Sequence, residues 1–101
     1  MTPNVARNRP AIEAICRRHR VHRLELFGSA ASGSDRPDSD FDFLVEFEQL
    51  PPGAYADAFF GLLEDLSQLL GRPVDLVVPS AIKNPYFRQA VDRTRVLVYA
   101  R

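Results

Sequence analysis

The residues from Asp40 to Phe47 alternate strictly in chemical character, and this pattern restricts the fold more than any other stretch of the chain. Successive side chains of a β-strand point to opposite faces, so a period of two indicates a strand and excludes a helix. One face of this strand must be buried, whereas the other carries carboxylates. The apolar face is Phe41, Phe43, Val45 and Phe47, and the opposite face is Asp40, Asp42, Leu44 and Glu46.

A second strand is predicted over residues 21–27, with the sequence VHRLELF. Its alternation places Leu24 and Leu26 on one face and Val21 and Phe27 on the other.

Two more strands are predicted towards the end of the chain. Residues 73–78, PVDLVV, are mostly apolar and are followed by Pro79, which ends the run. Residues 95–99 have enough β-branched content for an edge strand.

The segments between the strands have helical periodicity. Helices are predicted over 9–20, 55–70 and 85–92, the second of them ending at Gly71. Residues 30–39 predict a short helical turn followed by a loop. The resulting order is α-β-α-β-α-β-α-β, which predicts a mixed α/β (α+β) fold with about four strands and with helices on at least one face of the sheet.

The length of 101 residues has room for one compact domain, predicted over residues 1–101. Thirteen basic and thirteen acidic side chains cancel, so direct binding to nucleic acid or to a membrane surface is not expected. Cys16 is the single cysteine, which excludes an internal disulfide. No apolar run is long enough to span a bilayer and no signal peptide is evident, so a cytoplasmic location is predicted.

Three aspartates are the candidate catalytic and metal-binding residues. Asp40 and Asp42 are two positions apart on one strand, so their side chains leave the same face with α-carbons about 6.6 Å apart. Two such carboxylates can share a Mg²⁺ ion with substrate phosphates. Asp75 lies between Val74 and Leu76 in an apolar strand and needs a partner there. If its strand lies beside the first, Asp75 can accept a proton or hold a metal ion.

Gly28 and Ser29 follow the strand 21–27 where a helical turn is predicted. Such a junction offers backbone N–H groups and a hydroxyl to an anion, and glycine allows a close approach. The P-loop is excluded because Ser34 follows Gly33, and the GxGxxG dinucleotide fingerprint is also absent.

Together these residues form a pattern that resembles a known family. Residues 27–33 read FGSAASG, residues 39–45 read SDFDFLV after five intervening residues, and Asp75 lies in VDLV. This combination is similar to the signature of the minimal nucleotidyltransferases of the DNA polymerase beta superfamily, the MNT proteins, and the resemblance spans nearly the whole chain.

The resemblance implies a nucleotidyltransferase fold with a mixed sheet. It implies two Mg²⁺ ions held by Asp40 and Asp42, Asp75 as a metal ligand or general base, and contacts from Gly28 and Ser29 to the triphosphate of ATP. Many such proteins are antitoxins beside a HEPN-family ribonuclease toxin, in the manner of MntA. The implied enzyme is a protein adenylyltransferase that transfers AMP from ATP to a toxin tyrosine.

One departure from the family pattern leaves an alternative open. The family usually has Ala-Arg-Gly after the Gly-Ser pair, where this chain has Ala31-Ser32-Gly33. The alternative is a non-catalytic antitoxin that neutralises its toxin by occlusion, with Phe60 and Leu69 as apolar contacts outside the main helix stripe. Nucleotide transfer to a small molecule or an RNA end is disfavoured, because the chain has little room for a domain that would bind such substrates.

Overall fold

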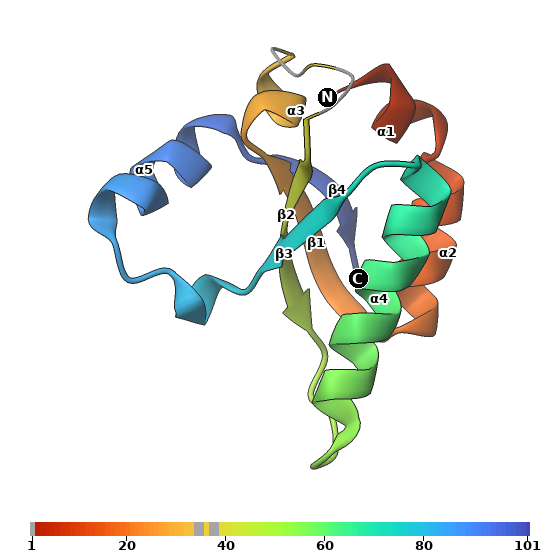
Figure 1. Cartoon of the computed structure of the whole chain (residues 1–101). Helices are drawn as coiled ribbons and strands as arrows, with labels where there is room; N and C mark the ends of the chain where they lie inside the picture. Colours follow the sequence, from red (N-terminus) through yellow and green to blue (C-terminus); the bar gives the residue numbers. More distant parts are fainter. Residues whose placement is uncertain (1, 34–35, 37–38) are drawn as a thin grey trace.

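The computed structural model describes residues 2–33, 36 and 39–101. Its elements follow the predicted order, with one extra helix at the start and a 3-10 turn after the third strand (Figure 1). The helical elements are α1 (Pro3–Arg7), α2 (Arg9–Arg18), α3 (Ser29–Ser32), α4 (Ala54–Leu70), the 3-10 turn η1 (Pro79–Ala81) and α5 (Pro85–Thr94). The strands are β1 (Val21–Phe27), β2 (Phe41–Phe47), β3 (Val74–Val77) and β4 (Val96–Ala100).

The four strands form one mixed sheet in the order β3-β2-β1-β4. β1 is antiparallel to both of its neighbours, whereas β2 and β3 are parallel. Two parallel neighbours need a long crossover, and α4 supplies it. The predicted mixed sheet flanked by helices is therefore confirmed.

The larger core lies between the sheet and the paired helices α2 and α4, which run side by side in Figure 1. The alternation of β2 is confirmed, because its phenylalanines and Val45 face this core while Leu44 belongs to a smaller cluster on the other face. α5 contributes Val91 to that smaller cluster, together with Phe27 of β1. None of the described helices is both long and apolar enough to cross a membrane.

The predicted faces of β1 are wrong at one residue. Val21 was placed opposite Leu24 and Leu26, but all three are fully buried in the same core. The pairing with β2 shifts register between Val21 and Arg23. An extra residue at such a bulge reverses the facing of every side chain before it, so Val21 turns inward.

Helix α1 was not predicted. Thr2 caps it by accepting a hydrogen bond from the Val5 N–H at 3.2 Å, and Pro3 occupies the first helical position. Val5 is fully buried, and the Asn4 side chain donates to the Leu70 carbonyl at 3.3 Å. A helix of five residues with one buried side chain has no measurable period, so only the Thr-Pro pair could have indicated it.

Close packing between α2 and α4 depends on Gly61. His19, at the end of α2, donates a 2.7 Å hydrogen bond from Nε2 to the Asp65 carboxylate of α4, and this bond lowers the pKa of Asp65. A Cβ atom on Gly61 would lie 2.5 Å from the His19 ring.

We therefore expect Gly61→Ala to destabilise the protein by about 1–2 kcal/mol. Alanine normally stabilises a helix by about 1 kcal/mol relative to glycine, but overpacking costs about 1–3 kcal/mol. Urea unfolding measures the difference. In a His19→Ala background the ring is absent, so the same substitution should become stabilising; a higher stability of Gly61→Ala in the unmodified chain would contradict this packing.

Candidate active site

Asp42 lies at the centre of the candidate site. In the sheet it is the direct neighbour of Phe27 on β1 and of Asp75 on β3. The parallel pairing that brings Asp75 beside Asp42 is the arrangement on which the sequence prediction depended. Asp40 precedes β2 directly, two residues before Asp42.

The turn after β1 brings the backbone against the Asp42 carboxylate. Gly28 has φ +75° and ψ −153°, a conformation that is strained for any residue with a side chain. A Cβ atom on Gly28 would lie 2.8 Å from Asp42 Oδ2. Glycine is therefore required both by the backbone conformation and by the carboxylate. Ser29 begins α3 directly after it.

The three carboxylates interact electrostatically. The pKa of Asp42 is raised, first by its partial burial and then by the negative charges of Asp75 and Asp40. Asp40 and Asp75 are exposed. The expectation that Asp75 needs a partner because its strand is apolar is wrong, since β3 is an edge strand and its Asp75 side chain reaches solvent.

Asp40, Asp42 and Asp75 have the ligand chemistry that a hard divalent cation needs, but they do not form a complete metal site. Their oxygen ligands and their mutual repulsion suit a positive ion. Within the described residues, however, no group of three His, Cys, Asp or Glu side chains is arranged to hold a metal ion by itself. Mg²⁺ commonly takes only one or two protein carboxylates and completes its shell with water and substrate phosphates. Asp40, Asp42 and Asp75 could therefore supply one or two of the ligands of such an ion.

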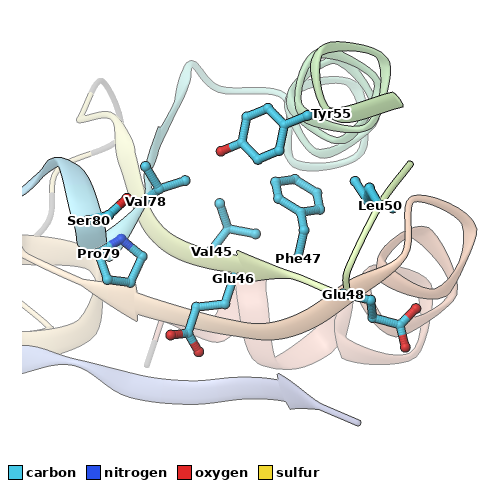
Figure 2. Close-up of a pocket in the computed structure, with 9 residues that line it drawn as sticks. All are labelled: Val45, Glu46, Phe47, Glu48, Leu50, Tyr55, Val78, Pro79 and Ser80. Atoms are coloured by element: carbon cyan, nitrogen blue, oxygen red, sulfur yellow. The ribbon is translucent and has the colours of Figure 1, made fainter. Parts of the chain in front are cut away.

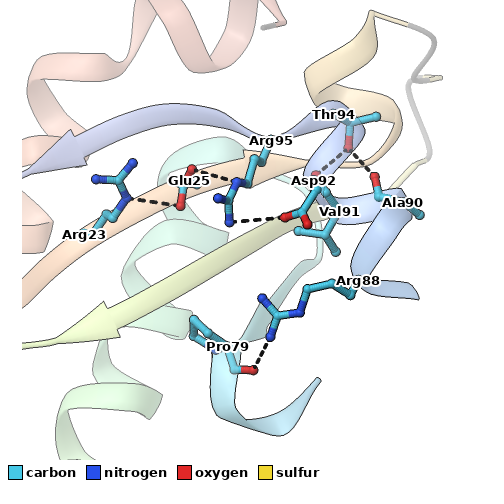
Figure 3. A network of polar contacts seen from close by, with 9 residues as sticks. All are labelled: Arg23, Glu25, Pro79, Arg88, Ala90, Val91, Asp92, Thr94 and Arg95. Atoms are coloured by element: carbon cyan, nitrogen blue, oxygen red, sulfur yellow. Dashed lines mark hydrogen bonds and ion pairs between the residues drawn. The ribbon is translucent and has the colours of Figure 1, made fainter. Parts of the chain in front are cut away.

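Thr94 is a site residue that the sequence prediction missed. Its hydroxyl accepts a 2.8 Å hydrogen bond from the Gly28 N–H. The same hydroxyl donates to the Ala90 carbonyl at 3.1 Å, as Figure 3 shows. The Gly28 N–H is therefore engaged within the protein and is not free for an anion. A backbone donor for a phosphate would come from Ser29 at the start of α3, because the N–H groups of Ala31 and Ser32 already donate to the Gly28 carbonyl at 3.2 Å.

We expect Thr94→Val to loosen the turn at Gly28. Valine keeps the shape of threonine but leaves the Gly28 N–H without an acceptor, which costs about 1 kcal/mol or more. Thr94→Ser retains the hydroxyl and is the matched control. Thermal unfolding should rank the unmodified chain and Thr94→Ser above Thr94→Val, and equal melting temperatures for valine and serine would show that this bond is not important.

Arg72 fixes the segment that carries Asp40. Its guanidinium donates to the Ser39 carbonyl from Nε at 2.8 Å and from Nη2 at 2.6 Å, and it stacks over the Phe41 ring at 3.9 Å. Arg72 therefore ties the start of β3 to the start of β2 and positions Asp40. The sequence prediction did not identify it.

A second polar network lies on the face of the sheet that α5 covers (Figure 3). The buried Glu25 carboxylate accepts from Arg23 at 3.1 Å and lies 3.7 Å from Arg95, which also pairs with Asp92 of α5. A buried carboxylate needs such partners, and these ones fasten β1 to the junction between α5 and β4.

The position where the family has arginine is Ser32, which is exposed and donates to the Ser29 carbonyl at 3.3 Å. Arg36 is also exposed, and its N–H donates to the Ser39 hydroxyl at 3.0 Å. The helical turn predicted in this region is confirmed as α3. The rest of the predicted loop, residues 34, 35, 37 and 38, lies outside the described residues.

Comparisons with known proteins identify the family of this chain. The family described as nucleotidyltransferase domain matches residues 9–98. A Methanocaldococcus jannaschii protein, provisionally named a protein adenylyltransferase, is 40% identical over 81 residues, which is 80% of each chain. The chain therefore belongs to the nucleotidyltransferase domain family and is an enzyme of the nucleotidyl-transfer class.

Solved structures narrow the resemblance within that family. One that is described, provisionally, as a minimal nucleotidyltransferase has a TM-score of 0.72 and 36% identity, and the match covers 90% of this chain and 89% of that one. Another match is a chain from the structure of a tri-AMPylated Shewanella oneidensis HEPN toxin in complex with an MNT antitoxin. The TM-score is 0.63 and the identity 20%, and the match covers 96% of this chain and 73% of that one. The predicted nucleotidyltransferase fold and the resemblance to the minimal nucleotidyltransferases are confirmed.

Proposed function

We propose that this chain is a Mg²⁺-dependent adenylyltransferase antitoxin that transfers AMP from ATP to a tyrosine of a partner HEPN-family toxin. The single observation that carries the chemistry is the position of Asp42, between the Gly28 turn on β1 and Asp75 on β3. The similarity to protein adenylyltransferases supports AMP as the transferred group, and the similarity to an MNT antitoxin in complex with an AMPylated HEPN toxin supports the partner.

The carboxylates have separate roles in this proposal. Asp40 and Asp42 would hold the divalent ions, with Asp75 as a further ligand; bound there, such ions align a triphosphate and stabilise charge on leaving pyrophosphate. Ser29 at the start of α3 binds phosphate oxygens through its backbone N–H and hydroxyl. Gly28 leaves the space in which the Asp42 carboxylate and the substrate approach the backbone.

Asp75 is suited to the proton transfer because it is exposed and can reach an incoming acceptor. The tyrosine oxygen bonds to the α-phosphorus of ATP while the bond to pyrophosphate breaks. The phenolic proton passes to Asp75. Activity therefore requires a Tyr hydroxyl on the partner.

The test is a labelling experiment with the purified chain, its co-expressed HEPN partner and MgCl₂. Label from [α-³²P]ATP should appear on the partner, whereas label from [γ-³²P]ATP should not, and EDTA should prevent the transfer. Mass spectrometry should locate AMP on a tyrosine, and Tyr→Phe at that position should remove it. Transfer of the γ-label, or of AMP to another residue type, would refute the proposed reaction.

Neutralisation by occlusion is the second candidate, and Phe60 of α4 favours it. Its side chain is 62% exposed, which is unusual for a large apolar residue and suits a partner surface. Leu69, the other residue predicted for that surface, packs against the main core instead. If Asp42→Asn still protects cells from the toxin while Phe60→Ser does not, occlusion explains the antitoxin activity.

A further inference from the structure

One hollow on the protein is lined by none of the three site aspartates. It has a volume of about 420 Å³ and lies at the end of β2 that carries Phe47 (Figure 2). Its walls are Val45, Glu46, Phe47, Glu48, Leu50, Tyr55, Val78, Pro79 and Ser80. The nucleotidyl-transfer site does not use these residues, so the hollow needs a separate explanation.

The hollow exists because β3 ends before β2 does. Backbone pairing between the two strands stops at Leu44 and Val77. The Phe41 N–H donates to the Pro73 carbonyl, so every second residue of β2 directs its backbone towards β3. In this pattern the Val45 carbonyl would next accept from residue 79, and Pro79 has no N–H.

A short piece of strand edge is consequently left open. The alternation directs the backbone of Phe47 to the same side, whereas the Glu48 N–H turns to the Arg20 carbonyl near β1. In the described part of the chain, no turn or loop backbone bonds to the Val45 carbonyl or to the Phe47 N–H and carbonyl. Unpaired groups on an edge are a template for an added strand.

The helix side of this edge is apolar and aromatic. The Phe47 and Tyr55 rings meet edge to face with centroids 5.4 Å apart, and Tyr55 stacks on Phe59 at 6.2 Å. Tyr55 is nevertheless 47% exposed. Val78 borders the same space in Figure 2. An apolar side chain of an added strand would fit between these walls.

The opposite side of the edge carries a negative charge. Glu46 is exposed, and within the described residues no ion pair to it exists, since its β1 neighbour Arg23 pairs with Glu25 instead. Glu48 differs, because Arg20 lies 3.7 Å and Arg101 3.3 Å from its carboxylate. A strand added here therefore meets apolar groups on one face and the unpaired charge of Glu46 on the other.

We propose that the open edge of β2 binds an extended segment of a partner protein in which apolar and basic residues alternate. Backbone bonds to Val45 and Phe47 would supply affinity, and the two faces would select the side chains. The proposal does not rest on the transferase chemistry.

The test uses the ¹⁵N-labelled full chain and a synthetic peptide, acetyl-Leu-Lys-Val-Lys-Leu-amide. Binding should shift the amide signals around Phe47 and slow hydrogen exchange of the Phe47 N–H, while the Asp42 signal stays unchanged. The peptide with glutamate in place of lysine, and a copy N-methylated on its pairing edge, should bind at least about tenfold more weakly. Glu46→Lys should weaken binding of the lysine peptide about 3- to 10-fold.

Glu64→Lys is the matched control, because it makes the same charge change at an exposed position of α4 and should leave binding unchanged. Equal binding of the lysine and glutamate peptides, or shifts elsewhere on the protein, would overturn the proposal. Absence of binding would also overturn it. Shifts at Phe47 that depend on protein concentration alone would assign the edge to a second copy of this chain.

Discussion

Asp42→Asn is expected to reduce AMP transfer at least about 100-fold. Asparagine keeps the size of the side chain but removes the charge that would hold a divalent ion against the triphosphate, and losses of this order follow when a group that stabilises transition-state charge is removed. The measurement is the initial rate of label transfer from [α-³²P]ATP at saturating MgCl₂. Asp57→Asn is the matched control, since Asp57 is exposed on α4.

The same variant should not lose stability. The pKa of Asp42 is raised in the folded protein, so its ionised form costs folding free energy. That cost is absent below the ordinary pKa of the carboxyl and is complete above the raised pKa. We therefore expect the melting temperature of Asp42→Asn at pH 7 to equal or exceed that of the unmodified chain. An active Asp42→Asn enzyme would remove Asp42 from the site, whereas an unfolded one would show that the carboxylate has a structural role.

Gly28→Ala is expected to lower both stability and activity. The backbone conformation of Gly28, φ +75° and ψ −153°, costs a residue with a side chain about 1–3 kcal/mol, and the new methyl group would also lie 2.8 Å from Asp42 Oδ2. The carboxylate must move to relieve this contact, so nucleotidyl transfer should fall about tenfold or more. Urea unfolding and the initial rate of transfer measure the two effects.

Gly33→Ala is a comparison at a second glycine with a positive φ. Gly33 has φ +82° and ψ 9°, which is the left-handed helical region, whereas Gly28 has ψ −153°, and nothing lies within 4 Å of a Cβ atom added to Gly33. Its alanine variant should therefore lose less stability than Gly28→Ala and retain more activity. Equal activity in the two variants would mean that the approach of Gly28 to Asp42 does not matter for catalysis.

The elements with a clear period could be predicted from the sequence. The alternation in β2 gave its core face and placed Asp42 on the opposite face, and the strand before Pro79 was recognised as β3. The neighbouring positions of Asp42 and Asp75 do not follow from the sequence alone, because local patterns give strands but not their order in a sheet. The resemblance to the minimal nucleotidyltransferases, and not the alternation of side chains, implied that Asp75 belongs to the same site as Asp40 and Asp42.

The supporting residues could not be predicted, since each acts across a long separation in the chain. Thr94 meets Gly28, and Arg72 meets Ser39, only after the sheet has formed. A threonine late in a helix and an arginine after a helix are ordinary residues in a sequence. The bulge that turns Val21 inward likewise has no local signal, because it reflects the register between two strands.

The early end of β3 at Pro79 also bears on how the protein avoids aggregation. β2 is aromatic and β-branched, which is the composition of segments that assemble into fibrils when their edges meet. Pro79 leaves only the last part of β2 open, and the Glu46 charge would repel an identical edge brought beside it. Glu46 thus acts as a gatekeeper, and a chain with valine at that position would be expected to precipitate during expression at concentrations where the natural chain stays dissolved.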